Sequence, residues 1–261
     1  MNALVTGATG GIGIHIARGL AASGATVTIT GRDRPRGEAV AREHGLQFVQ
    51  VDHSLIAANR ELARRFDALD LLVTNVGGLF AQRTVTSEGH ELSLATNFLG
   101  PAALTLALRS RVKRVVSVSS TAWNMAKGEP LSDLEAQQRY VGIEVHARAK
   151  LLSLLFTLAL ARREPQLIIN AVNPGMAWTP MTESLTPEAV PAWRFFWPIV
   201  RWFQRRADPA DAARGPLQLA TDTSSRTGRF FDGLKDKQVP ANFRATELQD
   251  RVFEHAVTCC L

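Results

Sequence analysis

Residues 6–13 read Thr6-Gly7-Ala8-Thr9-Gly10-Gly11-Ile12-Gly13, between a short apolar run at 2–6 and a stretch with helical spacing at 12–22. Glycines at 7, 11 and 13 permit a tight turn, close approach of the backbone to a pyrophosphate, and close packing of a helix on a sheet. The exposed N–H groups and the dipole of the helix N-terminus favour an anion there. Because the glycines follow a strand and open a helix, they predict a dinucleotide-binding turn.

Strands and helices alternate along the rest of the chain. Residues 25–30 are rich in β-branched side chains and predict the second strand. The further predicted elements are helix 35–44, strand 47–51, helix 55–66, strand 69–74, helix 87–108, strand 114–119, helix 139–162, strand 167–172, a short strand near 229–231 and helix 247–257. This alternation indicates parallel βαβ units. We therefore expect an α/β fold, with a single doubly wound Rossmann domain over 1–261 and a parallel sheet of about seven strands flanked by helices.

Composition and charge exclude several classes of protein. Hydrophobic residues make up 46% of the chain and charged residues 21%, which is typical of a soluble globular protein. The net charge is +6, but the basic residues are scattered and no zinc-finger, RRM or basic-zipper pattern occurs. We expect neither a nucleic-acid partner nor a metal site.

The cysteines and the apolar runs bear on location. Cys259 and Cys260 are adjacent, so they are poor disulfide partners, which favours a reducing cytoplasm. No apolar run approaches the length that spans a bilayer, and residues 1–6 lack the features of a signal peptide. The sequence therefore predicts a cytoplasmic protein without a membrane span.

The end of the second strand bears on the choice of cofactor. Thr30-Gly31-Arg32-Asp33 places an arginine after a glycine, with Arg36 nearby. A guanidinium group matches the oxygens of a 2′-phosphate, whereas an acidic side chain at this strand end accepts bonds from a ribose 2′-hydroxyl. Arg32 therefore favours NADP(H), and Asp33 keeps NAD(H) as the alternative.

Several further motifs follow in a recognisable order. They are Asp52, Thr74-Asn75-Val76-Gly77, Thr96-Asn97-Phe98-Leu99-Gly100, Val116-Ser117-Val118-Ser119-Ser120, Asn173-Pro174-Gly175 with Thr179, and Thr227-Gly228-Arg229-Phe230-Phe231. With the glycine turn, they resemble the short-chain dehydrogenase/reductase family, particularly its retinol-dehydrogenase-like branch. The likeness runs nearly from end to end, although residues 74–77 depart from the family's Asn-Asn-Ala-Gly.

The resemblance implies roles for residues of this chain. The implied catalytic residues are Asn97, Ser120 and Lys150, with His146 in the position of the family's tyrosine. The implied cofactor-binding residues are Gly7, Thr9, Gly11, Ile12, Gly13, Arg32, Asp52, Asn75, Gly77, Lys150, Pro174, Gly175 and Thr179.

One family motif is altered. The family carries Tyr-x-x-x-Lys, whereas here His146 stands four residues before Lys150. Residues four apart share one face of a helix, as the chemistry requires. Tyr140 is the only tyrosine, and on the predicted helix it would lie about 240° around and roughly 9 Å away along the axis from His146. The imidazole, with an ordinary pKa of about 6.5, suits proton exchange, and the charge of Lys150 should lower that pKa.

Residues 187–206 interrupt the alternation with aromatic side chains set among arginines. Three interpretations remain open: a helical pair packed on the core, an apolar lid over a substrate pocket, and a helix that contacts a membrane surface. The lid interpretation would make this segment a substrate-binding insertion.

Together these observations predict an NADP-dependent oxidoreductase with an atypical catalytic tetrad, acting on an apolar small molecule that is a carbonyl compound, an alcohol or an imine. Two alternatives stay open. One is an enzyme of the same fold with non-redox chemistry, such as a cyclase, dehydratase or isomerase. The other is a non-catalytic nucleotide-binding protein. The sequence also leaves a homo-oligomer open.

Overall fold

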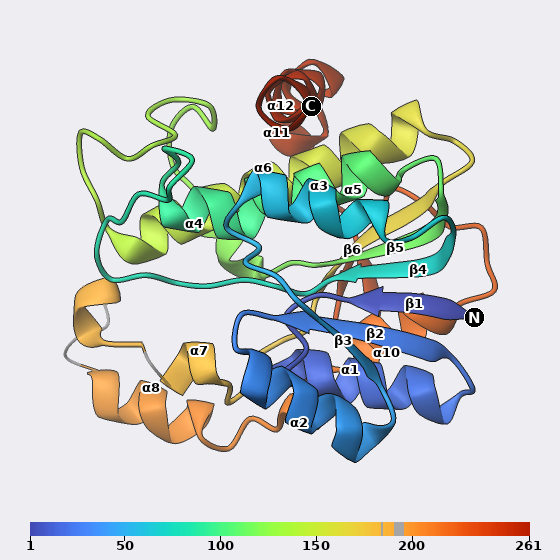
Figure 1. The fold of residues 1–261 in the computed structure, drawn as a ribbon. Coiled ribbons are helices and arrows are strands. Elements are labelled where there is room, and N and C mark those ends of the chain that lie inside the picture. Colours follow the sequence, from blue (N-terminus) through green and yellow to red (C-terminus); the bar gives the residue numbers. More distant parts are fainter. Residues whose placement is uncertain (184, 191–195) are drawn as a thin grey trace.

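The computed structural model describes residues 1–183, 185–190 and 196–261, and its described strands form one sheet (Figure 1). The order of the eight strands is β3-β2-β1-β4-β5-β6-β7-β8. Neighbouring strands are parallel except for the antiparallel pair β7 and β8. Their bounds are β1 Asn2–Val5, β2 Thr26–Gly31, β3 Gln47–Gln50, β4 Leu69–Thr74, β5 Val112–Val118, β6 Ile168–Asn173, β7 Phe230–Asp232 and β8 Lys235–Lys237.

Helices cover both faces of this sheet. On one face lie α1 Gly11–Ala22, α2 Arg34–His44 and α10 Arg214–Thr221. On the other lie α3 Ile56–Arg64, α4 Leu92–Leu94, the π-helical segment η1 Ala95–Leu99, α5 Gly100–Leu108 and α6 Gly142–Arg163. The remaining short elements are η2 Thr121–Met125, α7 Pro180–Glu183, η3 Pro187–Ala189, α8 Trp197–Gln204, α9 Pro209–Ala212 and α11 Ala241–Arg244.

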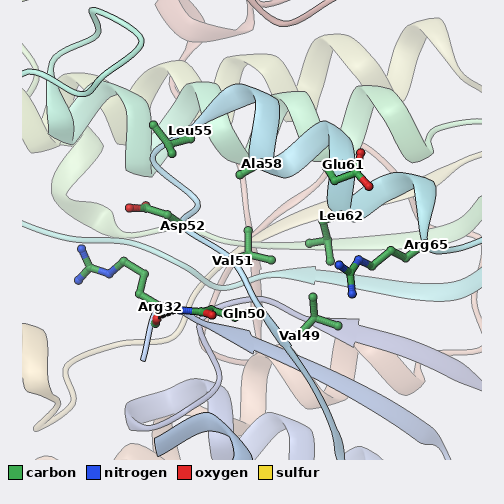
Figure 2. Close-up of a pocket in the computed structure, with 10 residues that line it drawn as sticks. All are labelled: Arg32, Val49, Gln50, Val51, Asp52, Leu55, Ala58, Glu61, Leu62 and Arg65. Carbon is green, nitrogen blue, oxygen red and sulfur yellow. Dashed lines mark hydrogen bonds between the residues drawn. The ribbon is translucent and has the colours of Figure 1, made fainter. Parts of the chain in front are cut away.

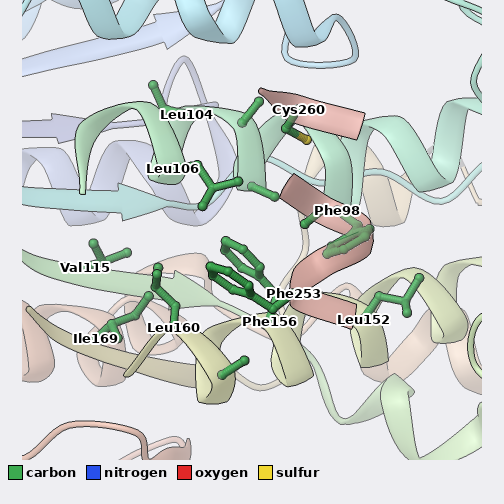
Figure 3. Close-up of a cluster of buried hydrophobic side chains, with 14 of the residues drawn as sticks. Phe98, Leu104, Leu106, Val115, Leu152, Phe156, Leu160, Ile169, Phe253 and Cys260 are labelled. Carbon is green, nitrogen blue, oxygen red and sulfur yellow. The ribbon is translucent and has the colours of Figure 1, made fainter. Parts of the chain in front are cut away.

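The helix α12, Thr246–Cys260, lies outside α5 and α6 and closes the larger core (Figure 3). Phe253 of α12 stacks on Phe156 of α6 with ring centroids 5.9 Å apart. Cys260 is fully buried, and its thiol donates to the Leu99 carbonyl at 3.4 Å. Because α6 is covered by the sheet on one side and by α12 on the other, its residues from Leu151 to Ala161 are buried on nearly every side of the helix, and only Ser153 among them is partly exposed.

The strand order reverses between β1 and β4, where the chain leaves β1 toward β2 and later returns to the other side. In open α/β sheets, ligands bind at such a switch point, outside the carboxyl ends of the strands. The glycine turn follows β1, and residues 75–78 follow β4, so both lie at this place. The predicted doubly wound fold is confirmed.

The strand β8 was not among the predicted elements. Its residues Lys235, Asp236 and Lys237 are exposed and charged, so no apolar alternation marks them. The pairing comes from a tight hairpin in which Gly233 has φ +59°. Lys237 also forms an ion pair with Asp232 on β7.

The two long predicted helices start later than expected. The predicted helix 87–108 begins only at Leu92, because Gly89 turns the chain with φ +89° and Glu91 caps the helix, accepting from Ser93 N and Leu94 N. The predicted helix 139–162 begins at Gly142, since Val141 before it is extended. Among the described helices, none is long and apolar enough to span a membrane.

Candidate active site

The glycine turn is shaped by contacts that exclude larger side chains. Gly7 and Gly11 have φ values of +62° and +56°, which favour glycine. A Cβ at Gly13 would lie 2.5 Å from Asn75 Nδ2 and 2.8 Å from Ala8 Cα, so only glycine lets α1 approach this closely. Gly10 precedes α1 without a side-chain cap. The first N–H groups of α1 are therefore available to a phosphate, and the turn fits a dinucleotide.

Residues that follow β4 and β6 hold this turn in place. Asn75, after β4, donates through Nδ2 to the carbonyls of Thr6 at 2.9 Å and Gly7 at 3.1 Å. Thr179, after β6, lies against the turn, because a Cβ at Gly11 would be 3.2 Å from its methyl carbon. The structure thus brings these predicted cofactor residues together. Pro174 and Gly175 immediately follow β6, and Gly175 has φ +88°.

A buried histidine also supports the glycine turn. The Thr30 hydroxyl accepts from Gly7 N at 3.2 Å and lies 2.6 Å from His53 Nε2. His53 Nδ1 lies 2.7 Å from Asn59 Oδ1, an acceptor, so Nδ1 carries the proton and Nε2 accepts from Thr30. Burial lowers the pKa of His53 to about 4. The neutral ring therefore links the glycine turn, β2 and α3.

A cavity of about 420 Å³ lies between β3 and α3 (Figure 2). Arg32 and Asp52 stand at one end of it, and Glu61 and Arg65 at the other. Asp52 Oδ1 accepts from the backbone N–H and the hydroxyl of Ser54, at 2.9 Å and 2.7 Å. The implied adenine and 2′-phosphate contacts, Asp52 and Arg32, therefore share one cavity.

Asp33, the acidic residue just after β2 that would favour NAD(H), uses its carboxylate in a helix cap. Asp33 caps α2, where Oδ1 accepts from Arg36 N at 3.0 Å. The Arg36 side chain turns back over the glycine turn and donates from Nε to the Thr9 carbonyl at 3.0 Å. Its guanidinium group covers Gly10, where a Cβ would lie 2.6 Å from a terminal nitrogen. Cationic groups, Arg32 and Arg36, thus flank the end of β2.

Asn97 lies in the π-helical segment η1 and binds the loop after β4. Its Oδ1 accepts from Gly78 N at 3.1 Å, and its Nδ2 donates to the Gly78 carbonyl at 2.8 Å. The same Nδ2 contacts the Ser93 carbonyl at 2.9 Å. Lys150 converges on this place, because a Cβ at Gly77 would lie 3.0 Å from Asn97 Oδ1 and 3.2 Å from Lys150 Nζ.

His146 is buried on α6 and also binds Gly78. Its Nδ1 lies 2.9 Å from the Gly78 carbonyl. A carbonyl only accepts, so Nδ1 carries the proton. Burial and the charge of Lys150 lower the pKa of His146 to about 4, so the ring is neutral near pH 7. Nε2 therefore keeps its lone pair, and within the part of the chain that the structure describes it has no hydrogen-bond partner.

Lys150 and Ser120 complete the predicted tetrad. Lys150 Nζ donates to the Val118 carbonyl at 3.4 Å, at the end of β5, and burial lowers its pKa to about 8. Ser120 Oγ accepts from Ala122 N at 3.1 Å at the start of η2, which leaves its own proton free to donate. No hydrogen bond joins Ser120 to His146.

Tyr140 precedes α6, so the helical spacing expected between it and His146 does not apply. Its hydroxyl donates to the Phe80 carbonyl at 3.1 Å and lies 3.4 Å from Glu91 Oε1. Burial and the Glu91 charge raise the pKa of the Tyr140 phenol. Tyr140 is therefore a structural hydroxyl that ties the loop after β4 to the cap of α4.

Within the described ranges, His, Cys, Asp and Glu side chains form no cluster that could hold a metal ion.

The comparisons with known proteins agree with this arrangement. Residues 1–189 match the model of the family described as short chain dehydrogenase. The chain belongs to the short-chain dehydrogenase family. The family's members are oxidoreductases, and the resemblance expected from the motifs is confirmed at this level.

Two curated relatives of this short-chain dehydrogenase have names that contain an alcohol, retinol or polyprenol. It is 31% identical to retinol dehydrogenase 12 of Mus musculus over 276 residues, which cover 98% of this chain and 84% of the relative. It is 36% identical to polyprenol dehydrogenase of Mus musculus over 201 residues, which cover 68% of this chain and 60% of the relative.

Solved structures resemble the short-chain dehydrogenase over most of its length. An uncharacterized protein from Mycobacterium paratuberculosis has a TM-score of 0.80 at 28% identity, over 99% of this chain and 92% of that chain. A variant of actinorhodin polyketide ketoreductase, solved with NADPH, has a TM-score of 0.68 at 25% identity, over 88% and 94% of the two chains.

Sequence reasoning missed the groups that support this site. Nothing in the sequence assigned the Gly78 carbonyl to His146, or the Thr30 hydroxyl to His53. The paired glycines at 77 and 78 were the available signal, since adjacent glycines after a strand indicate a close approach to the backbone.

Proposed function

We propose that this chain is an NADP-dependent dehydrogenase that oxidises an apolar alcohol, with His146 in place of the family's tyrosine as the proton acceptor. The observation that carries the proposal is the hydrogen bond from His146 Nδ1 to the Gly78 carbonyl. It leaves an unprotonated Nε2, which is a base and not a proton donor.

Each residue of the altered tetrad then has a role in alcohol oxidation. Ser120 donates a hydrogen bond from its hydroxyl group to the substrate oxygen, because its Oγ already accepts from Ala122 N. His146 Nε2 takes the proton of the substrate hydroxyl group, while the Gly78 carbonyl stabilises the imidazolium that forms. Asn97 holds Gly78, and Lys150 binds the ribose. A nicotinamide cofactor held by these residues would supply the acceptor for the hydride that leaves the carbinol carbon.

The lowered pKa of His146 gives the resting enzyme the neutral imidazole with which alcohol oxidation starts. With a pKa of about 4, about one imidazole in a thousand is protonated at pH 7. Reduction of a carbonyl needs that rare protonated form, whereas oxidation starts from the resting one. The names of the relatives, retinol and polyprenol dehydrogenases, agree with an apolar alcohol as substrate.

The preference for NADP rests on the end of β2. Arg32 lies in the same cavity as Asp52, and Arg36 lies over the glycine turn. Asp33, which would favour NAD, is engaged as the cap of α2.

We place the protein in the cytoplasm, in keeping with the unpaired thiols of Cys259 and Cys260, and regard residues 1–261 as one domain.

The test is oxidation of retinol and of a short polyprenol by the full chain with NADP⁺, followed by the formation of NADPH. The wild type should turn over at least one of them, and His146→Ala should reduce kcat by about 10²–10⁴-fold, the usual contribution of a positioned base. His44→Ala on α2 is the matched control and should keep full activity. Full activity of His146→Ala would overturn the proposal and favour an iminium substrate or non-redox chemistry.

A further inference from the structure

The helix α8 presents an apolar face to solvent. Phe196, at the start of the helix, and Ile199, Trp202 and Phe203 are exposed by 63%, 57%, 51% and 56%. Their spacing places them on one side of the helix. Clusters of exposed large apolar side chains in a folded protein mark an interaction site. We call these four residues, with Arg206, the α8 surface.

The opposite side of α8 is fixed to the protein. Arg201 donates to the Thr182 carbonyl at 2.6 Å, and its guanidinium group lies over the Trp178 ring at 4.6 Å from the centroid. Gln204 on the same side is buried. The helix is therefore already anchored on the segment around α7, and the α8 surface is not the side that packs on the core.

The charged residues of α8 and of the two positions after it are all arginines. The segment from Ala189 to Ala207 contains four arginines and no aspartate or glutamate, with Glu188 and Asp208 on either side of it. The Arg206 guanidinium lies over the Trp202 ring, 3.6 Å from its centroid, so a cation sits among the exposed aromatic rings. The Arg205 guanidinium lies 5.7 Å from the centroid of the Trp178 ring, on the anchored side of the helix. Trp193 and Arg194 of the predicted aromatic segment lie outside the described residues.

We propose that the α8 surface rests on an anionic lipid bilayer, without crossing it. Aromatic and aliphatic side chains enter the boundary between headgroups and acyl chains, and arginines beside them bind lipid phosphates. An apolar helix face with Arg206 over one of its aromatic rings, on a helix that contains no acidic residue, fits this occupant in both polarity and charge.

The position of α8 relates this contact to the cofactor site. In Figure 1, α7 and α8 lie beyond the carboxyl ends of the strands. Thr179, just before α7, lies against Gly11 of the glycine turn. A bilayer on the α8 surface would therefore lie on the side of the molecule that carries the carboxyl ends of the strands and the predicted cofactor residues, which suits a substrate dissolved in lipid.

The experiment measures co-sedimentation of the full chain with vesicles, with no substrate present. Vesicles of phosphatidylcholine with phosphatidylserine should bind the wild type, phosphatidylcholine alone should bind it more weakly, and added salt should release it. Arg206→Gln should weaken binding to the anionic vesicles by about fivefold, from the typical contribution of a cation at a membrane surface. Phe196→Ser with Trp202→Ser should abolish binding.

Matched controls change the same side-chain types elsewhere on the surface. Leu234→Ser, and Arg64→Gln with Arg214→Gln, should bind anionic vesicles like the wild type. NADPH affinity should be unchanged in every variant, which shows that each is folded. Because no substrate is used, failure here is distinguishable from failure of the proposed oxidation.

Three outcomes would overturn the membrane proposal. The first is a wild type that stays in solution with anionic vesicles. The second is binding that the α8 variants leave unchanged. The third is a wild-type dimer in sedimentation velocity that becomes a monomer in the α8 variants while no form binds vesicles, which would assign the face to a second copy of the chain.

Discussion

At the scale of single residues, an imidazole and a phenol differ in where the exchangeable proton resides. A phenol in this position would carry one proton toward the substrate. The ring of His146 carries its proton on Nδ1, where the Gly78 carbonyl accepts it, and presents a lone pair on Nε2. Under the proposed function, the substrate therefore meets a proton acceptor in the resting ring, and a backbone oxygen behind the ring fixes that resting state.

This arrangement predicts opposite pH profiles for the two directions. Between about pH 5 and pH 7, kcat/KM for alcohol oxidation should be flat, because His146, with a pKa of about 4, is neutral throughout. Over the same range, kcat/KM for aldehyde reduction should fall about tenfold per pH unit, since it follows the protonated fraction. Initial rates in both directions test this. An inflection of the oxidation rate near pH 6.5 would contradict the lowered pKa.

A second prediction at this scale concerns Arg32. Arg32→Ala should weaken NADPH binding by about 1–3 kcal/mol, the typical range for a hydrogen bond to a charged group. NADH, which lacks the 2′-phosphate, should bind as before. Calorimetric titration with both dinucleotides measures this, with the exposed Arg214→Ala as control. Equal losses for NADPH and NADH would show that Arg32 does not contact the 2′-phosphate.

At the scale of elements, the π-helical segment η1 places the Asn97 side chain against the loop that follows β4. Local π-helical turns are frequent at functional sites because they reorient a side chain without ending the helix. Here the segment directs Asn97 at Gly78, and the Asn97 amide forms hydrogen bonds with both the N–H and the carbonyl of Gly78. The same carbonyl accepts from His146. Asn97 is thus a positioning residue for the base.

Asn97→Ala should therefore affect both stability and catalysis. Losing the amide leaves buried backbone groups unpaired, at a cost of about 1–3 kcal/mol of unfolding free energy. The value of kcat should fall more than KM changes, because the acceptor of His146 Nδ1 is displaced. Urea unfolding and steady-state kinetics measure the two effects.

Thr105→Ala is the matched control for Asn97→Ala. It removes a buried hydroxyl that donates to the Pro101 carbonyl on the neighbouring helix α5, far from the base in the hydrogen-bond network. It should cost about 0.5–1.5 kcal/mol and leave kcat unchanged. A kcat of Asn97→Ala equal to that of the wild type would refute the positioning role.

The sequence predicts these elements well where a local pattern encodes them. The glycine turn, the parallel core strands and the His146–Lys150 spacing are short-range patterns, and the structure has them where expected. The start of α6 and the Gly78 contact depend on tertiary partners, whereas the strand β8 was missed because its exposed, charged residues carry no apolar alternation. The bond between His146 and Gly78 joins residues 68 positions apart, so no local pattern could reveal it.

At the scale of the whole molecule, two neutral histidines are buried in the folded state. His53 supports the glycine turn and His146 lies on α6, and burial lowers the pKa of each to about 4. In the unfolded chain each has a pKa near 6.5. As the pH falls from about 6.5 to about 4, the unfolded state therefore binds protons that the folded state does not. Stability is full above this range and is lost through it.

The unfolding free energy should consequently decrease between about pH 7 and pH 5, by up to about 1.4 kcal/mol per pH unit for each histidine. His53→Gln keeps a polar side chain that does not titrate, so it should show a shallower decrease, whatever its stability at pH 7. Urea unfolding at several pH values measures the slope. Parallel slopes for the wild type and His53→Gln would contradict the role of His53.

The acceptor of His146 is a main-chain oxygen, and this has a consequence for how such a site could arise in evolution. Tyrosine and histidine codons differ by a single nucleotide. Because every residue carries a carbonyl, an ancestral enzyme with tyrosine in this position needed no second mutation to supply the new acceptor. The exchange of a phenol for an imidazole in this position is then one genetic step, open in both directions.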